Sequence, residues 1–326
     1  MEEAPVVFQV ADGITAIDTF MGRRARYTAA YLLDAAEPTL VETGPGTSVE
    51  PVVAALDHLG IEPRALAHIV LTHIHLDHAG GVGQLAERFP MATVWVHERG
   101  APHLVDPSRL VASTARVWGE REMRELFGPA EPVSDERVRP LHHADVIRSG
   151  DRELEVLDTP GHASHHVALV DSRTGAVFTG DALGIHVPDL PVLRPATPPP
   201  EFDLERYVAS IERIRSAAAS ILLFAHFGPL ADVDATCDLA IQRVRDWASV
   251  VEDGVRDGDD PEELAARLES TALADIETGA EATLDLEMLE DRLRLISSIR
   301  MNAQGLARYW QRRGEREKRG SDAGTS

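Results

Sequence analysis

The chain has 326 residues, 44% of them hydrophobic, which is enough for one large domain or a domain with an appendage. Its 32 Lys and Arg residues stand against 54 Asp and Glu residues, and the net charge is −22. This charge repels nucleic-acid phosphates and anionic membranes, so we expect neither as a partner. The lone cysteine, Cys237, excludes an internal disulfide and a thiolate-rich metal site. Because the sequence shows neither a signal-peptide pattern nor an apolar run of membrane-spanning length, we expect a cytoplasmic protein.

Short strands alternate with helices in the first two thirds of the chain. Apolar and alternating runs predict strands at residues 6–10, 14–18, 29–33, 39–42, 69–71 and 93–97. Helical spacing predicts helices at residues 49–59, 84–89 and 108–127. Further strands are expected at residues 154–157, 167–170, 176–179 and 221–225, with a helix at 204–218. The proline-rich residues 187–200 predict a long loop without a regular element.

The character of the sequence changes after Pro229. Residues 232–313 carry almost no strand signal, and Ala, Leu, Arg and Glu recur there at helical spacing. We therefore expect a first domain at residues 1–230, a helical region at 231–313 and a disordered tail at 314–326. Two roles are open for the helical region, namely covering a pocket and forming a homodimer interface.

The densest polar motif follows the apolar strand at residues 69–71. It consists of His73, His75, Asp77 and His78. Side chains of a strand alternate between its faces, so we expect His73, His75 and Asp77 on one side as the strand ends. A solvated surface loop rarely carries this spacing, whereas neutral imidazoles beside a carboxylate suit a zinc-type divalent ion. The motif predicts a metal site.

Three further polar residues stand where predicted strands end. His162 closes the run Thr-Pro-Gly-His, Asp181 follows Gly180, and His226 follows the strand at 221–225. Taken alone, such a histidine is more often a core residue, and a Gly-Asp pair is usually a turn. Their joint order and spacing after the first motif favour metal ligation instead.

These motifs, taken in order, resemble the metallo-β-lactamase-fold hydrolase superfamily over roughly residues 5–230. The resemblance implies an α/β fold of the α+β kind, an αββα sandwich with a dinuclear metal site at one edge, and a helical region after this catalytic domain. It implies two divalent ions, with zinc favoured over iron or manganese. The ligands it implies are His73, His75 and His162 for the first ion, Asp77, His78 and His226 for the second, and Asp181 as the bridge.

The resemblance also implies roles around the ligands. Paired ions can hold a bridging hydroxide, and Asp77 beside it is the candidate catalytic proton carrier. Glu42 stands where the superfamily usually has Asp, and it can hold a ligand histidine from behind. His166, four residues after His162, and His186, on the loop after Asp181, are further candidates for supporting or substrate contacts.

The favoured reaction is hydrolysis of a small carboxylic ester, lactone or thioester by the dinuclear-metal-bound hydroxide. The motifs are similar to those of glyoxalase II-like and lactonase-like branches, although a basic glutathione-binding cluster is missing. Asp181 stands where many true β-lactamases have Cys, which disfavours antibiotic hydrolysis. One alternative is a small phosphodiester hydrolase, and an alternative of another class is a mono-iron persulfide dioxygenase. A non-catalytic binding module would leave the filled ligand positions unexplained. The expected partner is a small molecule, and residues 108–127 and 185–200 are expected to form the walls of its pocket.

Overall fold

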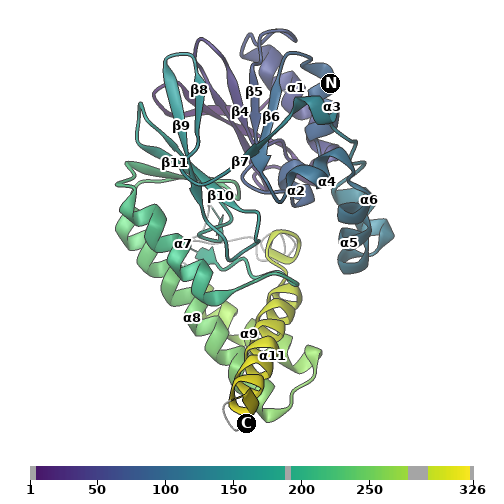
Figure 1. The fold of residues 1–326 in the computed structure, drawn as a ribbon, viewed down its shortest axis with the longest axis vertical. Helices are drawn as coiled ribbons and strands as arrows, with labels where there is room; N and C mark the ends of the chain where they lie inside the picture. The colour runs from purple at the N-terminus through teal and green to yellow at the C-terminus, as the bar shows by residue number, and fades with distance from the viewer. Residues whose placement is uncertain (1–4, 188–191, 278–292, 324–326) are drawn as a thin grey trace.

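The computed structural model describes residues 5–187, 192–277 and 293–323. Two β-sheets pack face to face, and helices cover the outer side of each sheet (Figure 1). The predicted αββα sandwich with a helical C-terminal region is therefore confirmed.

The first sheet has seven strands whose spatial order follows the chain. Strands β1 to β4 pair antiparallel and strands β4 to β7 pair parallel. Parallel neighbours need a crossover connection, and helices supply it here. The strands are β1 (Val7–Ala11), β2 (Ile14–Asp18), β3 (Ala29–Leu33), β4 (Thr39–Val41), β5 (His68–Val70), β6 (Thr93–His97) and β7 (Val138–Leu141). The connecting helices are α1 (Val49–His58), α2 (Leu76–Ala79), α3 (Val82–Arg88), α4 (Ala101–Val105), α5 (Ser108–Trp118) and α6 (Glu120–Leu126).

The second sheet has the strand order β15-β14-β11-β10-β9-β8. Its only parallel pair among the described residues is β11 with β14. The strands are β8 (Val146–Ser149), β9 (Arg152–Asp158), β10 (Val167–Asp171), β11 (Ala176–Gly180), β14 (Ile221–Phe224) and β15 (Gly228–Leu230). The helices of this half are α7 (Leu204–Ser216), α8 (Val233–Asp257), α9 (Pro261–Glu277) and α11 (Ile299–Ala323).

An apolar core fills each interface of the sandwich. One lies between the first sheet and helices α1 and α3, and a second, which includes Tyr31 and Phe178, lies between the two sheets. The third joins the second sheet to α7, α8, α9 and α11 around the fully buried Trp247. Each large apolar side chain buried in this way contributes about 1.5–3 kcal/mol. The C-terminal helices thus share a core with the second sheet.

Two segments differ from the sequence-based expectation. Residues 187–200 were expected to form an irregular loop, but β12 (Ile185–Val187) pairs antiparallel with β13 (Val192–Arg194). The expected tail at 314–326 is wrong for residues 314–323, which continue α11.

Local backbone geometry explains a third difference. The helix predicted at 108–127 is split into α5 and α6 at Gly119, whose φ of 81° is incompatible with a helix. The break lets α5 and α6 project together from the edge of the sandwich, beside the start of α11 (Figure 1).

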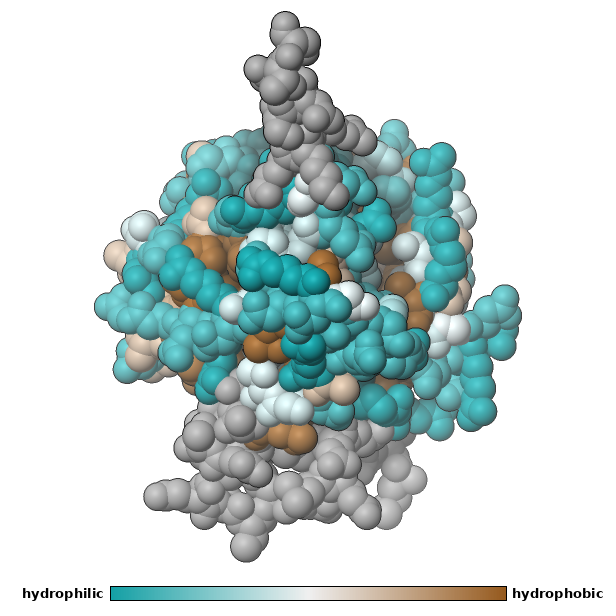
Figure 2. Space-filling model, turned by 90° about the horizontal axis from the view of Figure 1, so that it is seen from below, coloured by the Kyte–Doolittle hydropathy of each residue, from teal (hydrophilic) through white to brown (hydrophobic). Residues whose placement is uncertain are grey.

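One end of the molecule has a mainly hydrophilic surface. Figure 2 views the end of the molecule where the C-terminal helices lie, and it shows mainly hydrophilic residues with small apolar areas between them. Within the described ranges, no helix is both long enough and apolar enough to cross a membrane.

Candidate metal centre

The His73–His78 motif begins three residues after the end of β5. We expected its first members to extend a strand, but β5 stops at Val70 and α2 begins at Leu76. His73 and His75 therefore lie in the intervening segment, and Asp77 and His78 lie on the first turn of a helix. The helical turn places the ring of His78 beside that of His73, with ring centroids 4.1 Å apart.

The first group of candidate ligands consists of His73, His75 and His162. His75 Nδ1 lies 3.1 Å from His73 Nε2 and 2.9 Å from His162 Nε2. The three nitrogens lie within 4.8 Å of one another. His73 and His162 are buried, and His75 lines the large cavity described below. The structure thus brings together the three residues assigned to one ion by resemblance.

The second group consists of Asp77, His78 and His226. Asp77 Oδ2 lies 3.3 Å from His226 Nε2 and 3.5 Å from His78 Nε2. Both histidines are buried, whereas the Asp77 side chain is 24% exposed and lines the cavity. These are the three residues assigned to the other ion.

Asp181 lies between the two groups. Its Oδ2 is 3.5 Å from His162 Nε2 in the first group, and its Oδ1 is 3.5 Å from His78 Nε2 in the second. Gly180 before it has a φ of 50°, and a Cβ there would lie 2.5 Å from His166 Nε2. Only glycine allows the turn that points Asp181 at both groups.

Several candidate ligands are also held through their second ring nitrogen. His162 Nδ1 donates to the Ala196 carbonyl at 3.0 Å, and His226 Nδ1 donates to the Tyr27 carbonyl at 2.8 Å. His78 Nδ1 lies 3.4 Å from Glu42 Oε1. Such outer contacts fix the orientation and tautomer of a ligand histidine, and they leave the inward nitrogen free for an ion.

The donor atoms of the centre fit divalent cations. Within the described part of the chain, His78 Nε2 and Asp181 Oδ1 are buried without a hydrogen-bond partner. Leaving such atoms unsatisfied costs about 1–3 kcal/mol each, so their convergence calls for a ligand. Imidazole nitrogens with carboxylate oxygens are the donors that zinc and related ions prefer.

The protonation of the first group also suits a cation. Burial lowers the pKa of His73 well below its usual range and lowers that of His75 to about 4. Burial alone would raise the pKa of Asp181, but His78 and His162 outweigh it and the pKa falls. Neutral imidazoles and ionised carboxylates are the forms that bind metals. For His78, nearby carboxylates outweigh burial and raise the pKa, so an ion there would displace a proton.

The residues expected to support the ligands occupy different places. Glu42, which is 2% exposed, accepts a hydrogen bond from the Thr72 hydroxyl besides facing His78. His166 Nε2 accepts from the Asp181 backbone N–H at 3.0 Å, and its Nδ1 contacts the Thr159 hydroxyl at 2.8 Å. Both residues thus contact candidate ligands, Glu42 at His78 and His166 at Asp181.

His186 was a candidate for a supporting or a substrate contact. It is not among the residues that line the cavity. Its ring Nδ1 donates to the Phe227 carbonyl at 3.0 Å, and its backbone carbonyl accepts from Phe227 N–H at 3.1 Å. The pairing of β12 with β13 turns this residue toward the segment that carries His226. His186 is therefore a neighbour of a candidate ligand.

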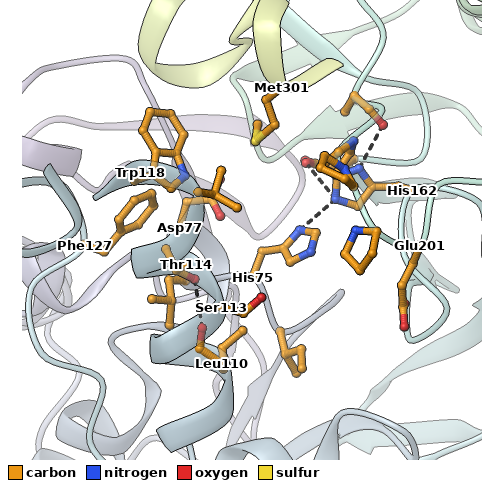
Figure 3. Close-up of a pocket in the computed structure, with 18 of the residues that line it drawn as sticks. His75, Asp77, Leu110, Ser113, Thr114, Trp118, Phe127, His162, Glu201 and Met301 are labelled. Atoms are coloured by element: carbon orange, nitrogen blue, oxygen red, sulfur yellow. Dashed lines mark hydrogen bonds and ion pairs between the residues drawn. The ribbon is translucent and has the colours of Figure 1, made fainter. Parts of the chain in front are cut away.

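A cavity of 370 Å³ opens over the metal centre. In Figure 3, Leu110, Thr114, Trp118 and Phe127 lie on one side of it, His162 and Glu201 lie on the other, and His75 projects between them. The walls come from α5, from the loop after β13 and from the chain around the start of α11. The predicted walls at 108–127 and 185–200 are thus supplemented by residues near 295–302.

Sequence reasoning missed His165. Because adjacent residues of a strand face opposite ways, only His166 was assigned to the centre. The two histidines precede β10, which begins at Val167, so strand alternation does not apply to them. His165 is 9% exposed, lines the cavity, and has an Nδ1 without a partner among the described residues.

Comparison with known proteins shows which family the chain belongs to. Residues 23–226 match the family model described as the metallo-beta-lactamase superfamily, and the chain belongs to this superfamily. The chain is 32% identical over 153 residues to a hydroxyacylglutathione hydrolase of Xanthomonas euvesicatoria, covering 47% of this chain and 45% of that protein. An uncharacterized protein of Bacillus subtilis is 28% identical over 216 residues, covering 64% of this chain and 86% of that protein.

A solved structure shows the same fold. An archaeal metallo-beta-lactamase superfamily protein from Sulfolobus tokodaii aligns with a TM-score of 0.63 at 22% identity, covering 86% of this chain and 93% of that one. This likeness shows the fold alone. The chain spans about half the length of the hydroxyacylglutathione hydrolases that it matches.

Proposed function

We propose that this protein is a metal-dependent hydrolase that cleaves a small carboxylic ester, lactone or thioester. The observation that carries the proposal is the position of Asp181, whose two oxygens face two separate histidine groups below a cavity. The likeness to hydroxyacylglutathione hydrolases supports a thioester or a related acyl bond.

The seven convergent residues would hold two divalent ions. His73, His75 and His162 would hold one, Asp77, His78 and His226 the other, and Asp181 both. Ions bound there would lower the pKa of a bound water toward neutral and would polarise the scissile carbonyl.

Asp77 is the residue best placed to move a proton. Burial would raise the pKa of its carboxyl, but His78 and His226 outweigh burial and hold the pKa well below its usual range. The ionised carboxylate lines the cavity, so it can accept a proton from the attacking water and deliver it to the leaving group.

The cavity walls indicate what kind of substrate fits. Leu110, Trp118, Phe127 and Met301 offer apolar surface, while Ser113 and Thr114 offer hydroxyl groups. Burying an apolar substrate group against such a wall contributes about 25 cal/mol per Å². We propose a substrate with an apolar acyl or alkyl portion.

Two basic side chains favour a second candidate function. Arg109 and Arg116 line the cavity of a chain whose net charge is −22. Guanidinium groups pair well with phosphate, so a small phosphodiester is the second substrate class to be tested.

A substrate panel tests these proposals. The purified protein, loaded with zinc or manganese, is assayed with acyl-homoserine lactones, aryl esters, glutathione thioesters and bis-aryl phosphates, and its metal content is measured. We expect turnover of a carbonyl substrate that Asp77→Ala reduces by about 10²-fold or more. Turnover that Asp77→Ala and Asp181→Ala leave unchanged would contradict the mechanism. One iron per chain with oxygen consumption would contradict the hydrolase class.

A further inference from the structure

The loop after β13 holds one of the candidate metal ligands. The Ala196 carbonyl accepts the hydrogen bond of His162 Nδ1 at 3.0 Å, and both residues are buried. The orientation of the His162 ring therefore depends on where this carbonyl lies. The carbonyl belongs to the peptide group that joins Ala196 to Thr197, and this group is planar and stiff.

The other end of that peptide group is bound by α11. The Thr197 N–H donates to Asn302 Oδ1 at 2.6 Å. The Thr197 hydroxyl, with its single proton, lies 2.9 Å from the same oxygen and 3.1 Å from the Asn302 carbonyl oxygen, and either can accept from it. Asn302 is 1% exposed, and its Nδ2 donates to the Ser298 carbonyl at 3.1 Å. The side-chain amide is thus fixed within α11 while it holds the loop.

One turn further along α11, a glycine permits the close approach. A Cβ at Gly305 would lie 1.8 Å from the Thr197 carbonyl oxygen, far inside van der Waals contact. Any larger residue would push the loop away from the helix. Two independent features therefore fix the position of Thr197: the space left by Gly305 and the hydrogen bonds that Thr197 donates to Asn302.

We propose that Asn302 and Gly305 are positioning residues for the metal ligand His162. The path has two hydrogen bonds and one rigid peptide group, from Asn302 Oδ1 through Thr197 N–H and the Ala196 carbonyl to His162 Nδ1. Both hydrogen bonds run in the same direction, so each polarises the other. Helix α11 lies outside residues 23–226, which match the superfamily model. Through Asn302 and Gly305 this helix would nevertheless support the metal centre.

The effect is expected on metal affinity. Removal of a group that orients a ligand histidine typically costs 10–100-fold in affinity. Asn302 acts one peptide group further out, so we expect about tenfold weaker binding of one ion in Asn302→Ala. Asn302→Asp keeps an oxygen that accepts from Thr197 N–H, and we expect it to recover most of the affinity.

The test titrates the metal-free full-length protein with Zn²⁺ alone against a chromophoric chelator. The variants are Asn302→Ala, Asn302→Asp and Gly305→Ala, and the histidine ring nitrogens are followed by NMR. Leu306→Ala is the matched control, since Leu306 is fully buried on the same helix and belongs to the apolar core. We expect it to lower the melting temperature without weakening zinc binding.

The outcomes separate positioning from general stability. Weaker binding of one ion in Asn302→Ala and Gly305→Ala, with a changed His162 Nδ1 signal and recovery in Asn302→Asp, supports the proposal. Unchanged affinity in both variants, equal weakening in Leu306→Ala, or loss of the fold in both variants would overturn it. The titration measures zinc binding without a substrate. Its result therefore does not depend on whether the proposed hydrolase activity is correct.

Discussion

Asp181 turns its two carboxylate oxygens to different histidines, with Oδ2 3.5 Å from His162 Nε2 and Oδ1 3.5 Å from His78 Nε2. Glu42 also approaches one histidine of each group, His73 and His78, but it faces His78 Nδ1 and not the Nε2 that Asp181 faces. A shared carboxylate offsets part of the repulsion between two neighbouring cations, so Asp181 decides whether two ions can bind together.

We predict that Asp181→Asn binds fewer metal ions than the wild-type protein, because the substitution removes the shared negative charge while keeping the shape. Metal content after equilibration with excess zinc, measured by mass spectrometry, should fall from about two ions per chain to about one or fewer. Glu201→Gln is the control, since its carboxylate lines the same cavity and accepts from Ser164 N–H. An unchanged metal content in Asp181→Asn would refute the bridging role.

Two adjacent histidines should give opposite kinetic results. His165 lines the cavity, so His165→Gln should raise KM by about 2–10-fold, as expected for one lost substrate contact, and leave metal content intact. His166 instead accepts from the Asp181 backbone N–H, so His166→Gln should lower kcat and weaken metal binding. Steady-state kinetics and metal analysis of both variants check this contrast. Equal effects of the two substitutions would contradict the assignment.

Trp118 should set the preference for apolar substrates. It lines the cavity, and its ring lies edge-on to Phe127 with ring centroids 5.7 Å apart. In Trp118→Ala we expect kcat/KM to fall about tenfold for long acyl chains and to stay nearly constant for acetyl esters, because only long chains bury surface against this wall. The test compares kcat/KM of the wild type and the variant for a series of aryl esters with increasing acyl-chain length. Met91→Ala, at an exposed site away from the cavity, is the control.

The buried ion pair of Arg152 and Asp171 should govern acid stability. Both side chains are fully buried, and Arg152 also donates to the Gly13 carbonyl at 2.8 Å, which ties the second sheet to the first. Asp171→Asn leaves a buried guanidinium without its counter-charge, so we expect a loss of about 3–5 kcal/mol in the free energy of unfolding at pH 7. Breaking the exposed pair Arg121–Glu125 should leave the free energy of unfolding almost unchanged, because solvent screens it.

The same pair predicts a pH dependence with a definite sign. Burial raises the pKa of Asp171, but Arg152 and Thr174 outweigh burial and lower the pKa below its ordinary 3.8. A lowered pKa stabilises the folded state above pH 3.8, and this stability is lost as the pH falls through the folded-state pKa. Urea unfolding between pH 7 and pH 3 should show a smaller acid loss in Asp171→Asn than in the wild type. Parallel curves would contradict it.

The resemblance of the ordered motifs to a known superfamily predicted the fold class, and local patterns in the sequence marked the candidate residues of the centre. His73, His75, Asp77 and His78 follow one buried strand, while His162, Asp181 and His226 stand near the ends of three others, and strand ends that share a sheet edge lie close together. Hydrophobic periodicity likewise marked most long strands and helices, because it reflects which face of each element is buried.

Tertiary contacts decided the rest, since they join residues that no local pattern connects. The short strands β7, β8 and β15 were not predicted from the sequence, and pairing with neighbouring strands defines them. His165 and His166 acquired separate roles only through the turn before β10. Asn302 and Thr197 are 105 residues apart in the sequence. From the sequence alone, Gly305 only lowers helix propensity, and its role is visible once the loop that carries Thr197 packs against it. Residue types and spacing thus determined the candidate ligands, and only the folded chain determined what holds them and what faces the cavity.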